Sequence, residues 1–288
     1  MKQCFFVSDL HGREDRYLKL FDLIQKEQPK AVFMGGDLLP PEFKALLRDA
    51  DFPIGDFVNE FFKHHLHQLK ETLREAYPEI FLILGNDDVR IEEKAFIKGD
   101  QEGYWHYIHK QKVVFGEYIV YGYSYVPPTP FRLKDWEKYD VGRYIDPNCL
   151  SPEQGSRTIP VDKNTIKYSN IRTDLEKLAG DDNFEKAIFL FHSPPYQTNL
   201  DRVALDGKKV DYAQLDLHCG SVAIQHFIKS RQPLLTLHGH IHESTRITGS
   251  WKDQIDQTLC FSAAHDGAEL GLVRFNPENL NEASREHI

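Results

Sequence analysis

Five short, mostly apolar runs recur along the chain, and each is followed closely by polar residues. They occupy residues 3–7, 31–34, 80–84, 187–191 and 235–237. A short apolar run bounded by glycine, proline or polar residues is typical of a strand that is buried on both faces. We therefore predict five buried strands.

Helical patterns separate most of these runs. Residues 14–28 have apolar positions at helical spacing and stop at Pro29, and residues 56–76 show a longer amphipathic stripe. Residues 174–179 predict a short helix, and Ser221 is a suitable N-cap for a further one. Strands alternating with helices indicate a βαβ arrangement, in which ligands gather beyond the carboxyl ends of the strands.

The remaining segments follow other patterns. Residues 112–122 predict a hairpin, residues 258–261 and 270–275 predict antiparallel strands, and we expect the polar last ten residues to fray. Residues 123–172 show no regular spacing of apolar residues and are rich in Tyr, Pro and Gly. A connection of this length is more often a functional lid or binding loop than a passive linker.

Residues suited to metal binding follow every one of the five predicted strands. His240 and His242 are two positions apart, so an extended backbone would turn both imidazoles to the same side. Alone, this stretch could be a histidine-rich turn. Comparable residues follow the other four runs, and five such strand ends in one chain favour a metal cluster. These are Asp9, His11, Asp37, Asn86 and His192.

The order and spacing of these motifs resemble those of the calcineurin-like metallophosphoesterases. The matching motifs are Asp9-Leu10-His11, Gly36-Asp37, Gly85-Asn86, His192 and Gly239-His240-Ile241-His242, and the resemblance spans residues 4–243. It implies an α/β fold, a four-layer α/β/β/α sandwich of two mixed sheets, with a dinuclear metal site at the carboxyl ends of the strands. We expect residues 1–288 to form one such domain, in which the loop-rich insertion at about 123–172 covers the active site.

The resemblance also implies a role for each ligand. Asp9, His11 and His242 would hold the first metal. Asn86, His192 and His240 would hold the second, and Asp37 would bridge the two. Nitrogen and oxygen ligands without thiolate suit Mn, Fe or Zn, and the sequence does not choose among them. His238 lies outside the motif, and we expect it to have a structural role or to orient a metal ligand.

The function that follows is a metal-dependent phosphoesterase acting on a small phosphodiester or phosphomonoester, with a slight preference for diesters. Two adjacent ions can lower the pKa of a bridging water and generate a hydroxide that attacks phosphorus. Ser8 and Ser193 have no base beside them in sequence. Two alternatives are a protein Ser/Thr phosphatase, for which Arg90 would be a weak substitute for the usual arginine, and a non-catalytic metal-binding scaffold.

The third motif departs from the family pattern. The family usually has Gly-Asn-His, and its histidine is thought to contact the phosphate and help the leaving group. Here Asp87 occupies that position in Gly85-Asn86-Asp87-Asp88. We predict a catalytic position for Asp87 but expect it to be ionised and a poor general acid. A cap on the following helix is the alternative.

Net charge and cysteine content limit the kinds of partner and the cellular compartment that we expect for this protein. A net charge of −9 argues against a nucleic-acid groove, and no apolar run is long enough to span a membrane. The absence of a signal peptide and four scattered cysteines indicate a cytoplasmic protein.

Histidines 64, 65 and 67 fit a solvated helix face rather than a second metal site. Four basic residues of the long loop could steer an anion toward the metals: Arg132, Lys134, Arg143 and Arg157.

Overall fold

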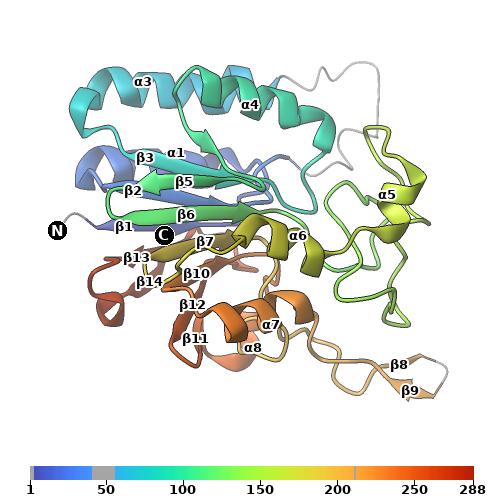
Figure 1. The fold of residues 1–288 in the computed structure, drawn as a ribbon. Helices are drawn as coiled ribbons and strands as arrows, with labels where there is room; N and C mark the ends of the chain where they lie inside the picture. Colours follow the sequence, from blue (N-terminus) through green and yellow to red (C-terminus); the bar gives the residue numbers. More distant parts are fainter. Residues whose placement is uncertain (1–2, 41–55, 211) are drawn as a thin grey trace.

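The computed structural model describes residues 3–40, 56–210 and 212–288, and two mixed six-stranded sheets form its centre (Figure 1). The first sheet has the order β14–β13–β1–β2–β3–β4 and the second β11–β12–β10–β7–β6–β5. The strands of the first sheet are β1 (Cys4–Val7), β2 (Ala31–Gly35), β3 (Glu79–Ile83), β4 (His106–Tyr107), β13 (Gly271–Phe275) and β14 (Ser284–His287). Those of the second are β5 (Lys112–Phe115), β6 (Tyr118–Tyr123), β7 (Ala187–Phe191), β10 (Leu235–His238), β11 (Lys252–Ile255) and β12 (Thr258–Ser262).

The central strands of each sheet run parallel. β1, β2, β3 and β4 are parallel in the first sheet, and β6, β7, β10 and β12 in the second. The outer strands β5 and β11 of the second sheet and β13 and β14 of the first are antiparallel to their neighbours, which makes both sheets mixed. The carboxyl ends of β1, β2 and β3 therefore share one edge of the first sheet, and those of β7 and β10 share one edge of the second.

Each central strand is buried on both faces because one face packs on helices and the other on the opposite sheet. In β2 and β3, Phe33 and Phe81 point toward the second sheet and stack on each other, with ring centroids 5.2 Å apart. Phe115 of the second sheet meets both rings edge-on. Val32 and Leu82, one position away, instead join the core beneath the helices. This double burial explains why the strands are continuous apolar runs.

Helices cover the outer faces of the two sheets, so the predicted four-layer sandwich is confirmed (Figure 1). One set consists of α1 (Glu14–Glu27), α3 (Lys63–Leu73) and α4 (Glu93–Gln101), and the other of α6 (Ile171–Ala179) and α7 (Val222–Arg231). The shorter helices are α5 (Lys163–Tyr168) and α8 (Ser244–Thr248). No helix in the described part of the chain is both long and apolar enough to cross a membrane.

The predicted helix at residues 56–76 is composite. It begins as a π-helix, η1 (Phe57–Phe62), continues as α3, and ends as a 3₁₀ turn, η2 (Arg74–Ala76). Asp56 caps it by accepting a hydrogen bond from the backbone N–H of Asn59 at 3.0 Å. Two further 3₁₀ turns are η3 (Arg90–Glu92) and η4 (Leu280–Glu282).

The structure corrects the predicted C-terminal part in two respects. β12 and β13 do not pair with each other, because β12 lies parallel to β10 and β13 lies antiparallel to β1 in the other sheet. The last residues do not fray, since β14 pairs with β13. The loop after His192 also contains an unpredicted two-stranded ribbon, β8 (Lys209–Val210) and β9 (Ala213–Gln214).

Candidate metal centre

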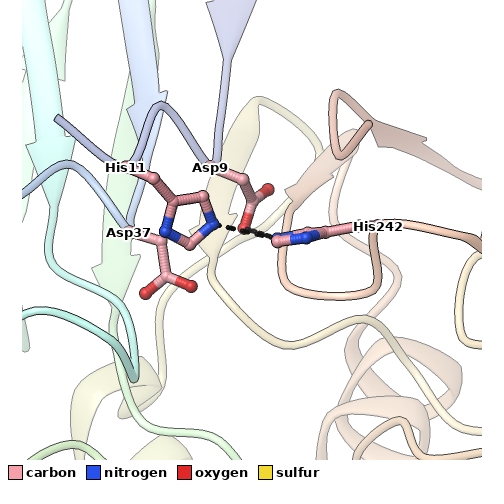
Figure 2. A group of neighbouring side chains, drawn as sticks. All are labelled: Asp9, His11, Asp37 and His242. Atoms are coloured by element: carbon pink, nitrogen blue, oxygen red, sulfur yellow. Dashed lines mark hydrogen bonds and ion pairs between the residues drawn. The ribbon is translucent and has the colours of Figure 1, made fainter. Parts of the chain in front are cut away.

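The carboxyl ends of five strands bring all seven predicted ligands to one place. Asp9 and His11 follow β1, Asp37 follows β2, Asn86 follows β3, His192 follows β7, and His240 and His242 follow β10. Four of these side chains, from the ends of both sheets, face one another (Figure 2). They are Asp9, His11, Asp37 and His242.

These four side chains form the first group of candidate ligands. One ligand atom from each lies within 4.8 Å of the others. The Nε2 atoms of His11 and His242 are 3.1 Å apart, and His242 Nε2 is 3.2 Å from Asp9 Oδ1. Imidazole nitrogens and carboxylates converging in this way need a cation or protons between them.

The second group shares Asp37 with the first. Asp37, His192 and His240 also offer ligand atoms within 4.8 Å of one another. His192 Nε2 lies 3.2 Å from Asp37 Oδ2 and 2.9 Å from the amide oxygen of Asn86. Among the described residues, Asp37 alone belongs to both groups, which is the arrangement required of a ligand that bridges two ions.

The backbone turns sharply where it presents these ligands. Asp9, His11, Asp37 and His240 have positive φ angles of 58°, 49°, 52° and 75°. A non-glycine residue in this left-handed region is strained, and such strain persists only where the surrounding structure enforces it. Here the loops after β1 and β2 are tied together, since the N–H groups of Asp9 and His11 donate to the carbonyls of Gly36 and Asp37 at 3.0 and 2.8 Å.

The glycines of the motifs allow the ligands to approach one another. A Cβ on Gly85 would lie 2.3 Å from Asp37 Oδ1 and 2.6 Å from His192 Cε1. A Cβ on Gly36 would lie 2.7 Å from His192 Nδ1, and this residue also has a φ of 94°. Side chains at either position would occupy the space of the candidate ligands, so glycine is required by geometry as well as by conformation.

Comparison with known proteins agrees with this geometry. The sequence model of the calcineurin-like phosphoesterases matches residues 4–244. The chain belongs to this family. It is accordingly a phosphoester hydrolase of a metal-dependent class, and no curated protein matches it significantly in sequence.

Solved structures share the fold of this phosphoesterase. A protein from Thermus thermophilus is 15% identical with a TM-score of 0.56, and the match covers 99% of this chain and 98% of that protein. A dimetal phosphatase from Danio rerio is 10% identical with a TM-score of 0.54, covering 99% and 95% of the two chains. At these identities the likeness establishes the fold alone.

The electrostatics of the phosphoesterase site fit bound cations. Burial disfavours the charged forms of Asp9 and Asp37, yet neighbouring histidines outweigh it and lower the pKa of both carboxyls. Burial likewise opposes protonation of His192, but Asp37 and Asp9 raise its pKa to about 10. The site therefore attracts positive charge, which metal ions would supply in place of protons. His11 Nδ1 is buried without a hydrogen-bond partner among the described residues, and the nitrogen and oxygen donors suit Mn, Fe or Zn.

Several residues orient the candidate ligands. The His192 Nδ1 atom lies 2.7 Å from the carbonyl of Gly35, which turns Nε2 toward Asp37 and Asn86. Arg16 is buried and donates to the carbonyl of Asp9 at 2.6 Å. The structural role predicted for His238 is confirmed, because its two ring nitrogens contact the Ser193 carbonyl and the Thr236 hydroxyl at 2.9 and 2.8 Å.

Asp88 is a structural residue that the sequence analysis did not identify. Its buried carboxylate accepts hydrogen bonds from the backbone N–H groups of Gly85, Leu38 and Leu39 at 2.8, 3.1 and 2.7 Å. It thereby joins the loop after β3 to the loop after β2. The only sequence signal was a second acidic residue after Asn86, which does not distinguish this role from a surface charge.

Asp87 points into the site rather than into the following helix. Its Oδ1 accepts a hydrogen bond from the Asn86 amide at 2.9 Å, and its Oδ2 lies 3.8 Å from His11 Nδ1. The next helical turn, η3, has Val89 as its N-cap and receives no side-chain cap. The alternative role as a helix cap is therefore wrong.

A cavity of about 340 Å³ adjoins the metal ligands. Its lining includes Asp37, Asn86 and Asp87, residues 240–243 after β10, and parts of the segment after β6 and of the loop after His192. The ribbon β8–β9 and the helix α5 extend from these two segments at the same end of the molecule (Figure 1). Parts of the segment 123–172 therefore line a cavity that Asp37 and Asn86 also line.

The basic residues expected over the metal centre are placed elsewhere. Lys134 is fully buried against Glu137, Arg143 pairs with Glu153, and Arg157 donates to the carbonyl of Pro152. Neither these three residues nor Arg132 line the cavity. Their predicted placement is wrong, and for Lys134, Arg143 and Arg157 the reason is that their partners lie within the loop itself. The histidines at 64, 65 and 67 belong to neither candidate ligand group.

Lys134 instead holds the wall of the cavity. Its Nζ donates to the carbonyl of Thr129 at 2.8 Å and pairs with Glu137, whose Oε2 accepts the Thr129 backbone N–H at 2.8 Å. Removing one partner of a buried ion pair typically destabilises a protein by about 3–5 kcal/mol, whereas an exposed pair contributes about 0–1 kcal/mol.

Replacing Lys134 with methionine should therefore lower the free energy of unfolding substantially and raise KM. The matched control is Arg143→Gln, which removes an exposed pair from the same loop. Urea denaturation and steady-state kinetics measure the two effects. Equal stability and equal KM for the two variants would contradict a role for the buried pair in shaping the cavity.

Proposed function

We propose that this phosphoesterase hydrolyses small phosphodiesters with two metal ions held by the seven converging side chains. Asp9, His11 and His242 would hold one ion, and Asn86, His192 and His240 the other, with Asp37 shared. The observation that carries the proposal is that two ligand groups share Asp37 and adjoin a single cavity. Such ions neutralise a phosphate and lower the pKa of a water molecule toward neutrality.

Neither of the two serines beside the candidate ligands, Ser8 and Ser193, is a convincing nucleophile. Ser8 is buried, and its hydroxyl has no hydrogen-bond partner among the described residues. The Ser193 hydroxyl donates to the adjacent Pro194 carbonyl. Neither serine is paired with a general base, which nucleophilic catalysis by a hydroxyl requires. This supports direct attack by water rather than a covalent intermediate.

The charge of the cavity supports a diester over a monoester. No lysine or arginine of the described ranges lines it. A phosphodiester carries one negative charge, whereas a monoester near neutral pH carries up to two. The described lining of the cavity therefore provides no additional lysine or arginine to bind the second charge of a monoester.

The two alternative functions, a protein Ser/Thr phosphatase and a non-catalytic metal-binding scaffold, have less support. Arg90, the weak substitute for a protein-phosphatase arginine, donates to the Tyr125 hydroxyl and pairs with Glu93, and it does not line the cavity. A non-catalytic scaffold would not need seven converging ligands beside a cavity. We further propose that residues 1–288 form one phosphoesterase domain, with the segment at about 123–172 as its substrate-selecting cover.

Metal analysis combined with a generic assay tests the proposed function. The purified protein should bind close to two equivalents of Mn²⁺, measured by plasma mass spectrometry after dialysis. It should then hydrolyse bis(p-nitrophenyl) phosphate with a higher kcat/KM than p-nitrophenyl phosphate. Metal binding without hydrolysis of either ester would favour the scaffold, and a clear preference for the monoester would overturn the diester assignment.

A further inference from the structure

The cavity beside the metal ligands has mainly apolar walls. Its apolar lining comes from two segments far apart in sequence, one after β6 and one after β7. Six of these residues are Pro127, Pro130, Phe131, Val203, Leu205 and Leu215. The volume of about 340 Å³ is at the lower end of the range for small-molecule sites, so it suits one compact organic group.

Acidic side chains line much of the remainder of the cavity, together with His218, His240 and His242. Among the described residues the acidic ones are Asp37, Asp87, Asp146, Asp216 and Glu243, and no lysine or arginine is present. None of the last three forms an ion pair with a described lysine or arginine. Asp216 instead accepts hydrogen bonds from the Tyr196 hydroxyl and the His218 backbone N–H at 2.6 and 2.9 Å. No lysine or arginine of the described lining therefore offsets the charge of Asp146 and Asp216.

Asp146 and Asp216 reach the cavity from different loops. Asp146 belongs to the segment after β6, and Asp216 follows the β8–β9 ribbon. The two residues line the same cavity, and burial first and then the charge of Asp216 raise the pKa of Asp146. An anionic group entering between these loops would meet both carboxylates without a compensating lysine or arginine of the described lining, and like charges in an apolar surrounding repel strongly.

We propose that the cavity selects substrates whose organic group is apolar and bears no negative charge. Asp146 and Asp216 repel a substrate whose organic group is anionic. The apolar walls of the cavity bind the apolar part of the organic group. This inference rests on the proposed phosphodiesterase function and names its substrate class. It excludes nucleoside polyphosphates and acidic phosphopeptides, and it admits esters of apolar alcohols that are neutral or cationic. Rejection by unpaired like charge is a common means of achieving specificity.

A matched set of diesters tests this inference. All members are p-nitrophenyl phosphodiesters, so the leaving group stays constant, and the second ester group is methyl, benzyl, trimethylammonioethyl or 4-carboxybenzyl. With the Mn²⁺-loaded protein, kcat/KM for the benzyl ester should exceed that for the 4-carboxybenzyl ester by about tenfold or more. The trimethylammonioethyl ester should be at least as good a substrate as the methyl ester.

Neutral replacements assign the selectivity to particular residues. Asp216→Asn and Asp146→Asn should each raise kcat/KM for the 4-carboxybenzyl ester relative to the benzyl ester. Asp206→Asn is the matched control, because Asp206 is an exposed carboxylate of the same loop that pairs with Arg202 and does not line the cavity. It should leave the benzyl to 4-carboxybenzyl ratio unchanged.

The outcomes separate this inference from the proposed function. No hydrolysis of any of the four esters by the metal-loaded protein would overturn the proposed function. Hydrolysis with equal kcat/KM for the benzyl and 4-carboxybenzyl esters would overturn the inference alone. A selective wild-type protein whose selectivity is unchanged in both asparagine variants would overturn the assignment to Asp146 and Asp216. If one asparagine variant does not fold, the ester series on the wild-type protein and the other asparagine variant still test the inference.

Discussion

Replacing Asp37 with alanine is expected to abolish the metal centre and reduce kcat/KM for bis(p-nitrophenyl) phosphate by about a thousandfold or more, equivalent to about 4 kcal/mol of transition-state stabilisation. Asp37 is the one described side chain common to both candidate ligand groups, and its carboxylate lies 3.2 Å from His192 Nε2. A ligand shared by two ions should be needed by both. Plasma mass spectrometry should therefore find that less than one equivalent of Mn²⁺ is retained.

A buried carboxylate elsewhere in the chain provides the control for this experiment. Asp37 and Asp135 are each 2% exposed, but Asp135 accepts hydrogen bonds from Arg90 and Thr158 instead of facing the metal ligands. Asp135→Ala should lower stability while metal content stays at the wild-type level. A folded Asp37→Ala protein that keeps both ions would remove Asp37 from the bridging position.

The positions of the candidate ligands could be predicted because they depend on local sequence. An apolar run buried on both faces identifies a parallel strand, and the fold rule places ligands beyond its carboxyl end. Asp9 and His240 are 231 residues apart, yet the His240 N–H donates to the Asp9 carboxylate at 3.0 Å. That contact forms because two strand ends meet at one place. Each of these strand ends can be recognised from its own local sequence.

Residues that act through distant partners could not be predicted in this way. Asp140 lies in the irregular loop and accepts hydrogen bonds from the Ser221 hydroxyl and the Val222 N–H, so it supports the cap of α7 from 81 residues away. Lys134 resembled a free surface cation because nothing in its neighbourhood indicated burial. The sequence shows which side chains carry charge, but only the tertiary structure shows which charges are already paired.

The second large effect on catalysis is expected from substitutions of Asp87, which occupies the position where the family usually has a histidine. Its carboxyl faces His11 and lines the cavity, so it lies close enough to affect the reacting group. In the protein without ions, the charge of Asp37 first, then burial and the charge of Asp88, raise the pKa of Asp87 to about 7. The repulsion comes mainly from Asp37 and less from its neighbour Asp88, contrary to what adjacency in sequence suggested.

Metal binding should reverse this shift. The charge of Asp37 would be offset by the cations it holds, and cations near a carboxylate lower its pKa. Asp87 would then be ionised near neutral pH and unable to donate a proton to a leaving alcohol. General acid catalysis typically contributes about 10²–10⁴-fold, so its absence should be evident for leaving groups that require protonation. Nitrophenyl esters should be hydrolysed much faster than alkyl esters.

A leaving-group series on the wild type and three variants decides the role of Asp87. The series extends from nitrophenyl to simple alkyl esters of one diester type, with Mn²⁺ content measured for each protein. Asp87→Ala and the isosteric control Asp87→Asn should change kcat for both classes by a similar factor. Asp87→His should accelerate the alkyl esters selectively, by about a hundredfold. If Asp87→Ala instead slows alkyl esters far more than nitrophenyl esters, Asp87 is protonated in the working enzyme and is itself the general acid.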